Sequence, residues 1–191
     1  MRLDHIAYRV RDRHTTAKFF REAFGYKVQT EFDIDFGGGK CAKCLALEPP
    51  ERQNAPRHLI PWVAGEAIYI PCPDGGMQNV VQDYHLAPEI FVSDGSPGSI
   101  VGDWVAARGG VGGIHHLAYQ VEDVAATMKE WRDRGYAEFT SEEPMRCPGL
   151  TQVFTKPSSL TGVIYEFIER QEFGFCKDNV RQLMLSTQEE K

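Results

Sequence analysis

The sequence of 191 residues predicts an α+β fold in which two βαβββ modules form a cleft-like barrel, with an additional C-terminal helix. Two observations carry this prediction. Residues 3–26 and residues 114–136 resemble each other, and in both copies a strand pattern is followed by the pattern of a short amphipathic helix. Three further strand-like stretches come after each helix. Two such modules can place their mixed sheets around one shared cleft.

The internal repeat can be followed residue by residue. LDHIAYRVRDRHTTAKFFREAFGY aligns with IHHLAYQVEDVAATMKEWRDRGY, at an offset of 111 from His5 and His116 onward. One deletion later, Gly-Tyr meets Gly-Tyr at the end of both segments. Random apolar patterning does not give so many identities at one offset, so the module is duplicated. The identical pairs are His5/His116, Ala7/Ala118, Tyr8/Tyr119, Val10/Val121, Asp12/Asp123, Thr16/Thr127, Lys18/Lys129 and Arg21/Arg132.

Capping residues mark the ends of the two predicted helices. An aspartate follows each first strand, and aspartate is a favoured N-cap residue. A glycine follows each helix, where a left-handed C-cap residue belongs. These residues are Asp12 and Gly25 in the first copy and Asp123 and Gly135 in the second.

The remaining strands complete both modules. Alternation and apolar content predict strands over 27–36, 41–47 and 89–92 in the first copy, and over 138–141, 150–155 and 162–168 in the second. The second half of the tail has helical spacing, with Val180, Leu183 and Met184 on one face.

The predicted organisation is one structural domain in three parts. Residues 1–110 form the first module, 111–170 the second, and 171–191 a C-terminal lid helix. The first module is longer because of an insertion at about 49–86, rich in Pro, Gly, His and aromatic residues. A segment of that length with little periodicity is either a functional lid or a dimer arm.

Composition excludes several classes of protein. A net charge of −6 without a Lys/Arg run argues against a nucleic-acid partner. No apolar run approaches the roughly 18–20 residues that span a bilayer, and the charged N-terminus lacks the apolar core of a signal peptide. Five cysteines at irregular spacings do not indicate a disulfide framework. The expected protein is soluble and cytoplasmic.

His5, His116 and Glu166 are the candidate metal ligands. The two histidines occupy equivalent places in the repeat, so pseudo-twofold symmetry can bring them together. Glu166 shares a strand face with Ile164 and Ile168, where a carboxylate is costly unless it is paired or binds metal. Two histidines and a carboxylate form the facial triad of non-haem Fe(II) sites. The alternative is that both histidines are hydrogen-bonded core residues and Glu166 pairs with an arginine.

Other motifs carry weaker signals. Successive residues of a strand point to opposite faces, so His115 is expected to point away from the face that carries His116, which makes it a poor ligand candidate. Glu89 is a candidate mirror of the carboxylate ligand, as a fourth ligand or a base. Cys41 and Cys44 form a lone CxxC without a second ligand pair, which favours ordinary strand residues. The glycines of 109–113 precede a strand and are interpreted as a linker.

The ligand-bearing segments LDHIAYRV, GIHHLAYQVED and GVIYEF resemble the vicinal oxygen chelate superfamily, also described as glyoxalase/bleomycin resistance/dioxygenase proteins. This resemblance covers nearly the whole chain except about 49–86. It implies the paired-module fold around a divalent metal, with His5, His116 and Glu166 as ligands. Methylmalonyl-CoA epimerases carry very similar strands.

The C-terminal third resembles 4-hydroxyphenylpyruvate dioxygenase, in LTQVFTKP, in GVIYEFIER and in GFCKDN before a helix. The helix over 99–108 also fits that family. The match implies that Gln152 and Phe154 line the substrate pocket and that Phe175 and the following helix close it. Val180 stands where the family has phenylalanine and Ile100 where it has glutamine, and those dioxygenases are about twice as long.

The resulting hypothesis is a non-haem Fe(II)-dependent dioxygenase, an oxidoreductase that acts on a 2-oxo acid with O2. Gln152 is the candidate substrate donor, and Phe154 and Phe175 are candidate walls. The same ligands also accept Mn, Co or Zn. The first alternative is a metal-dependent epimerase or lyase of the methylmalonyl-CoA epimerase or glyoxalase type, with Glu89 as a base. The second is a metal-free binding module. The resemblance to this superfamily also implies a homodimer.

Overall fold

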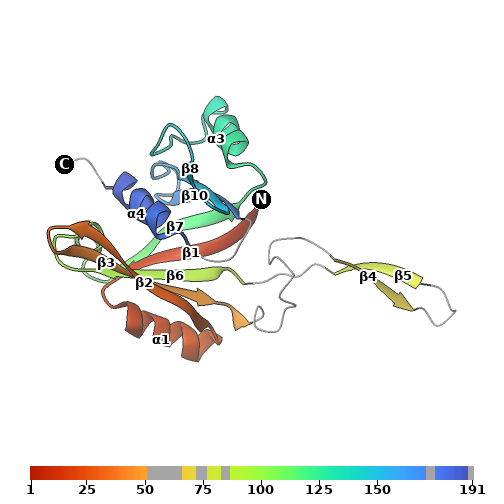
Figure 1. The fold of residues 1–191 in the computed structure, drawn as a ribbon, viewed down its shortest axis with the longest axis horizontal. Helices are drawn as coiled ribbons and strands as arrows, with labels where there is room; N and C mark the ends of the chain where they lie inside the picture. Colours follow the sequence, from red (N-terminus) through yellow and green to blue (C-terminus); the bar gives the residue numbers. More distant parts are fainter. Residues whose placement is uncertain (51–65, 72–76, 83–86, 171–174, 189–191) are drawn as a thin grey trace.

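The computed structural model describes residues 1–50, 66–71, 77–82, 87–170 and 175–188. In these residues, eight strands form one curled mixed sheet, a half-barrel accompanied by four helices (Figure 1). The strand order is β2-β3-β6-β1-β7-β10-β9-β8, so the two modules share one continuous sheet. The predicted α+β architecture of paired βαβββ modules is confirmed.

The elements of each module follow the order predicted by the repeat. The first module contains β1 (Arg2–Val10), α1 (Arg13–Phe24), β2 (Lys27–Gly37), β3 (Lys40–Glu48) and β6 (Glu89–Gly95). After α2 (Ile100–Ala107), the second contains β7 (Gly112–Gln120), α3 (Val124–Asp133), β8 (Met145–Cys147), β9 (Leu150–Phe154) and β10 (Ile164–Arg170). The chain continues into α4 (Lys177–Ser186).

Strands β1 and β7 pair at the centre of the sheet and join the two modules. They run antiparallel, with Ala7 opposite His116 and His5 opposite Ala118. On their outer sides, β1 pairs with β6 and β7 pairs with β10, both in parallel. The pseudo-twofold axis therefore passes between β1 and β7, and it brings the first strand of each repeat to the middle of the molecule.

The repeat extends to the details of the helix caps. The Asp12 side chain accepts a hydrogen bond from the Thr15 amide at 2.8 Å, and the Asp123 side chain accepts one from the Ala126 amide at 2.9 Å. Both aspartates have nearly the same backbone angles, φ −145° and −144° with ψ 109°. Gly25 adopts the left-handed conformation expected of a C-cap residue.

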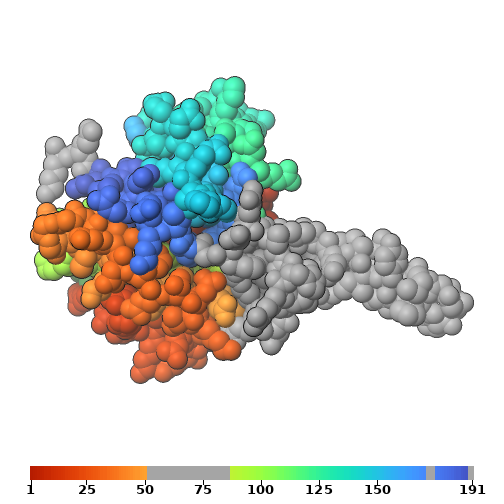
Figure 2. All heavy atoms as spheres, viewed as in Figure 1, coloured from red at the N-terminus to blue at the C-terminus, as the bar shows by residue number. Residues whose placement is uncertain are grey.

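The two faces of the sheet have different roles. Helices α1 and α3 each pack on the strands of their own module and bury one apolar cluster. Helix α4 packs on the opposite face through Val180, Leu183 and Met184, as the helical spacing predicts. The space-filling view places α4 (blue) between the orange β2–β3 hairpin and the turquoise second module (Figure 2). The interior of the half-barrel thus lies beneath α4.

One predicted strand is wrong. Residues 138–141 contribute only an isolated bridge between Phe139 and Thr155, and the third sheet strand of the second module is β8. The reason is the turn at Pro148-Gly149, in which Gly149 has a φ of 72°. Proline followed by a glycine with positive φ suits the central pair of a tight turn, and this turn pairs Cys147 with Leu150.

The insertion at about 49–86 contains β4 (Glu66–Pro71) and β5 (Met77–Gln82), which pair as a separate antiparallel sheet. The rest of the insertion, 51–65, 72–76 and 83–86, lies outside the described residues. Its role as a lid or a dimer arm stays a prediction. In the described part of the chain, every helix is too short or too polar to cross a membrane.

Gly112 is required where the two central strands meet. Its φ is +90°, and a Cβ at this position would overlap the carbonyl oxygen of Arg9. We expect Gly112→Ala to lower the free energy of unfolding by at least about 2 kcal/mol, because it adds a backbone clash to the cost of a positive φ. Gly109→Ala is the matched control, since Gly109 has a φ of +69° with open space around it, and about 1 kcal/mol is expected. Urea unfolding measures both, and equal losses would contradict the clash.

Candidate metal centre

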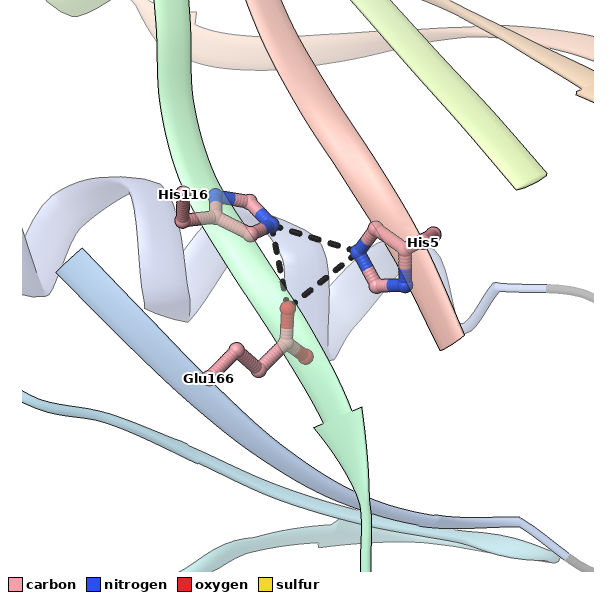
Figure 3. Close-up of side chains that lie close together, drawn as sticks. All are labelled: His5, His116 and Glu166. Atoms are coloured by element: carbon pink, nitrogen blue, oxygen red, sulfur yellow. Dashed lines mark hydrogen bonds and ion pairs between the residues drawn. The ribbon is translucent and has the colours of Figure 1, made fainter. Parts of the chain in front are cut away.

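Three strands deliver three ligand-type side chains to one point inside the half-barrel. His5 comes from β1, His116 from β7 and Glu166 from β10, and all three are buried (Figure 3). The two Nε2 atoms are 3.2 Å apart, and Glu166 Oε2 lies 3.3 Å from His5 Nε2 and 3.0 Å from His116 Nε2. The structure therefore brings together the three residues that the sequence predicts as ligands.

The spacing of these donors suits a single divalent cation. Metal–ligand bonds of about 2.1 Å at right angles place adjacent donors about 3.0 Å apart. The three observed separations of 3.0–3.3 Å are close to this value, as three donors on one face of an octahedron would be. The two imidazoles and one carboxylate also match the donor types of non-haem iron sites. The cluster fits a divalent metal.

Asp4 and Arg170 hold His5 in position. His5 Nδ1 donates to Asp4 Oδ1 at 2.7 Å, which leaves Nε2 directed at the cluster. Arg170 in turn donates to both Asp4 oxygens, at 2.6 and 3.0 Å. A bulge between Leu3 and His5 makes Asp4 the extra residue of β1, so two consecutive side chains are buried. Such a carboxylate–histidine pair orients a ligand and increases its basicity.

A second bulge, at the equivalent place on β7, brings His115 to the same cavity as His116, although alternation along the strand predicts that it points to the other face. Ala7 pairs with His116 and Tyr8 pairs with Ile114, so His115 is the extra residue and does not follow the alternation of the strand. It is buried, and its Nδ1 lies 2.8 Å from Nδ1 of His116. His115 and Asp4 are thus related by the repeat, and each supports the neighbouring ligand histidine.

Gln152 and Asn179 connect the carboxylate ligand to α4. Gln152 Nε2 donates to Glu166 Oε1 at 2.5 Å, so Oε2 is the oxygen that faces the histidines. Asn179, on α4, donates to Gln152 Oε1 at 3.2 Å. The Gln152 amide therefore positions Glu166. The role predicted for Gln152, as a hydrogen-bond donor to the substrate, stays a prediction.

The charges of the cluster are set by mutual pairing. Burial acts to raise the pKa of Glu166, but His5 and His116 hold it well below its usual range. Burial acts to lower the pKa of His5, but the carboxylates of Glu166 and Asp4 outweigh it, and the pKa is raised. For His116, burial prevails and the pKa is lowered. A divalent cation would compete with protons for the ring nitrogens of both histidines.

Glu89 does not mirror Glu166. On β10, Glu166 lies two positions beyond the residue paired with His116, whereas on β6 the residue two positions beyond the partner of His5 is Phe91. Glu89 is itself that partner. Phenylalanine thus occupies the position related by symmetry to the carboxylate ligand.

The Glu89 carboxylate faces a different part of the interior. It is buried, and Oε2 lies 3.9 Å from Nη2 of Arg170. Within the described residues, the cluster of metal-type donors consists of His5, His116 and Glu166 only. The described part of the chain therefore offers three protein ligands at this point, and Glu89 is not a fourth.

Aromatic side chains enclose the cluster. The rings of His116 and Phe154 have centroids 4.7 Å apart, and those of His5 and Phe175 are 5.2 Å apart. Phe91 lies 4.8 Å from Phe175 by the same measure. These residues line a cavity of about 30 Å³, which accommodates water but is far smaller than pockets of roughly 300–1,000 Å³ that hold ligands. In this conformation the cavity has no room for a ligand of the usual size.

Several residues of the site were not predicted from the sequence. Asp4, His115, Arg170 and Asn179 support the ligands, and Arg9 lines the cavity beyond them. A signal existed for Arg9, because it lies four residues after a predicted ligand and so on the same strand face. Asp4 and His115 had none, since strand alternation places them on the other face.

The half-barrel of two modules and its buried donors define a class of metal-binding proteins. The chain belongs to the glyoxalase/bleomycin resistance protein/dioxygenase superfamily, whose family model matches residues 4–153. Members of this superfamily are typically enzymes that depend on a divalent metal. A search of curated proteins finds no significant match.

Solved structures share this fold at low sequence identity. A hypothetical protein from Bacillus halodurans C-125 is 22% identical with a TM-score of 0.60, over 92% of this chain and 98% of that one. A methylmalonyl-CoA epimerase is 21% identical with a TM-score of 0.59, over 90% and 97%. A mutant of 4-hydroxymandelate synthase from Streptomyces coelicolor is 19% identical with a TM-score of 0.66, over 97% of this chain and 54% of that chain. These likenesses establish the fold alone.

Proposed function

We propose that this chain is a dioxygenase that uses Fe(II) and O2 to oxidise a 2-oxo acid. The observation that carries the proposal is the buried set of His5, His116 and Glu166, with Phe91 in place of a fourth carboxylate. Three protein donors leave three coordination positions free on an octahedral ion. When bound, Fe(II) would supply electrons and sites for the carboxylate and keto oxygens of the substrate and for O2.

The residues around the triad would orient its members and exclude water. Asp4 would hold His5, and Gln152 would fix which oxygen of Glu166 faces the ion. Phe154 and Phe175 would form apolar walls that keep bulk water away from a reactive intermediate. In this proposal the protein contributes orientation and a dry pocket, while the redox chemistry belongs to the metal and the substrate.

We also propose that Phe175 and α4 open to admit the substrate. The narrow cavity supports this, since its walls must separate, and α4 contributes part of them through Val180, Leu183 and Met184. Asn179 would couple the closure of α4 to the metal ligands, because it donates a hydrogen bond to Gln152, which in turn donates one to Glu166. We further propose that residues 1–110, 111–170 and 171–191 are the three parts of one structural domain. Residues 171–174 lie outside the described residues.

Oxygen uptake tests the proposed reaction. Anaerobically Fe(II)-loaded protein is offered a panel of aryl and alkyl 2-oxo acids, with the His116→Ala variant as the blank. We expect at least one acid to give O2 uptake accompanied by CO2 release, both lost in the variant. If metal is bound and no acid supports uptake, the dioxygenase proposal is wrong.

A metal-dependent epimerase or lyase is the second candidate. The observation that favours it is Glu89, a second buried carboxylate on the strand next to β1, which would act as a base. Solvent deuterium exchange into acyl-CoA thioesters tests this reading, with Glu89→Gln expected to abolish exchange while metal binding persists. Metal analysis of the purified protein separates both enzymes from a metal-free binding module.

A further inference from the structure

We propose that Arg9 binds a second anionic group of the substrate, so that the 2-oxo acid carries a carboxylate at the end remote from the metal. This inference rests on the proposed function and names its substrate class. Arg9 and His5 lie on the same face of β1 and line the same cavity. Their Cα atoms are about 13 Å apart, at roughly 3.3 Å per strand residue. The wall of this cavity thus carries the metal-type donors and, four residues further along β1, a guanidinium.

Within the described residues, the Arg9 guanidinium has no carboxylate as a counterion. The residue is only 2% exposed. Its Nη2 donates to Thr187 Oγ1 at 3.1 Å, whereas its buried Nη1 has no hydrogen-bond partner among the described residues. Among the ion pairs of the described residues, none joins a carboxylate to Arg9. A buried charge in this state is unfavourable, and a bound anion would offset its desolvation.

The other well-buried arginines show how this fold normally compensates a guanidinium. Arg170 forms an ion pair with Asp4 at 2.6 Å. Arg13 pairs with Glu31 at 2.6 Å and with Asp94 at 3.1 Å. Arg9 is equally buried but faces a cavity in place of a carboxylate. The contrast indicates that its partner is a ligand.

The surroundings of Arg9 are suited to an anion. Two guanidiniums lie near the Trp104 ring, with Arg108 3.7 Å and Arg9 5.7 Å from its centroid. His115 also lines the cavity, and its buried Nε2 has no hydrogen-bond partner in the part of the chain that the structure describes. When His116 binds metal through Nε2, its Nδ1–H donates to Nδ1 of His115, whose own proton then resides on Nε2. A carboxylate at this end would meet two free donors.

The charge of Arg9 persists at neutral pH. Burial and the nearby Arg108 lower its pKa to about 9, so the guanidinium is still protonated at pH 7. The apolar side chains of Phe91, Phe154 and Val180 line the same cavity. They favour a substrate with an apolar body between its two polar ends.

Binding of matched acids tests the inference without turnover. Ni(II)-loaded protein is titrated calorimetrically with 2-oxoglutarate and 2-oxopentanoate, 2-oxoadipate and 2-oxohexanoate, and 2-oxopimelate and 2-oxoheptanoate. Each pair differs in a terminal carboxylate or methyl group. We expect the dicarboxylate of at least one length to bind roughly 10- to 100-fold more tightly than its partner, as a charged hydrogen bond would give.

The variants assign that preference to a residue. Arg9→Met should abolish it while affinity for the monocarboxylates changes little, and Arg9→Lys should retain part of it. Arg108→Met is the matched control, because Arg108 contacts the same Trp104 from the exposed side and does not line the cavity. Thermal melting checks folding, and Arg9→Met should be at least as stable as the parent without ligand. If it fails to fold, Arg9→Lys and Arg9→Gln replace it.

The outcomes separate this inference from the function on which it rests. If monocarboxylates bind and no dicarboxylate is preferred, or if Arg9→Met keeps the preference, Arg9 is not the anion site and the dioxygenase proposal survives. If no 2-oxo acid binds the Ni(II)-loaded protein, both are refuted.

Discussion

Replacing His116 with alanine should abolish the stabilisation that a divalent metal gives this protein. A cation at about 100 times its Kd stabilises the folded state by about 2.7 kcal/mol, which corresponds to a rise in Tm of roughly 5–10 °C for a chain of this size. Without His116 only His5 and Glu166 remain, and we expect the affinity for Co(II) or Ni(II) to fall by more than about 100-fold, since even supporting residues contribute 10–100-fold. Scanning calorimetry with and without metal measures the shift.

A matched control is available on the surface. The His14 side chain is 62% exposed and lies beside Glu31. It is not one of the three candidate metal ligands. His14→Ala should keep the metal-induced rise in Tm. The metal-free His116→Ala variant should also stay folded, because Glu166 still pairs with His5. A full metal shift in the His116→Ala variant would show that the ion binds elsewhere.

The fold was predictable because the repeat and the caps are local signals. The two aspartate caps and Gly25 have the roles expected from their residue types. The pairing of β1 with β7 follows from the duplication, since related strands meet at a pseudo-twofold axis. The strand expected over 138–141 was wrong because the Pro148-Gly149 turn, and not apolar alternation, selects which residues pair.

The site was predictable only where strand alternation holds. His5, His116 and Glu166 follow it. The symmetry of the repeat brings the two histidines together, and the pairing of β10 with β7 adds Glu166. Asp4 and His115 break it, because each is the extra residue of a bulge, and bulges have no reliable signature in a single sequence. The assignment of Glu89 as a mirror carboxylate depended on register, which long-range pairing fixes and local sequence does not.

Removing Arg170 should destabilise the protein more than an ordinary surface change. Arg170→Met leaves the Asp4 carboxylate buried with His5 as its remaining partner. Breaking a buried ion pair costs about 3–5 kcal/mol, which would lower Tm by roughly 6–20 °C in a chain of this size. Urea unfolding at pH 7 measures the free energy, and a loss below about 1 kcal/mol would contradict this role of the pair.

The double variant and pH separate the ion pair from simple packing. Asp4→Asn combined with Arg170→Met removes both charges of this pair and leaves only the Glu89 carboxylate without Arg170, so its loss should be smaller than the sum of the two single losses. Burial acts to raise the pKa of Asp4, but Arg170 and His5 outweigh it, and the folded pKa lies below the ordinary 3.8. The stabilisation is therefore complete above about pH 3.8 and disappears as the pH falls through the folded pKa. The difference between the parent and Asp4→Asn should shrink in that acid range, whereas a packing defect would be independent of pH.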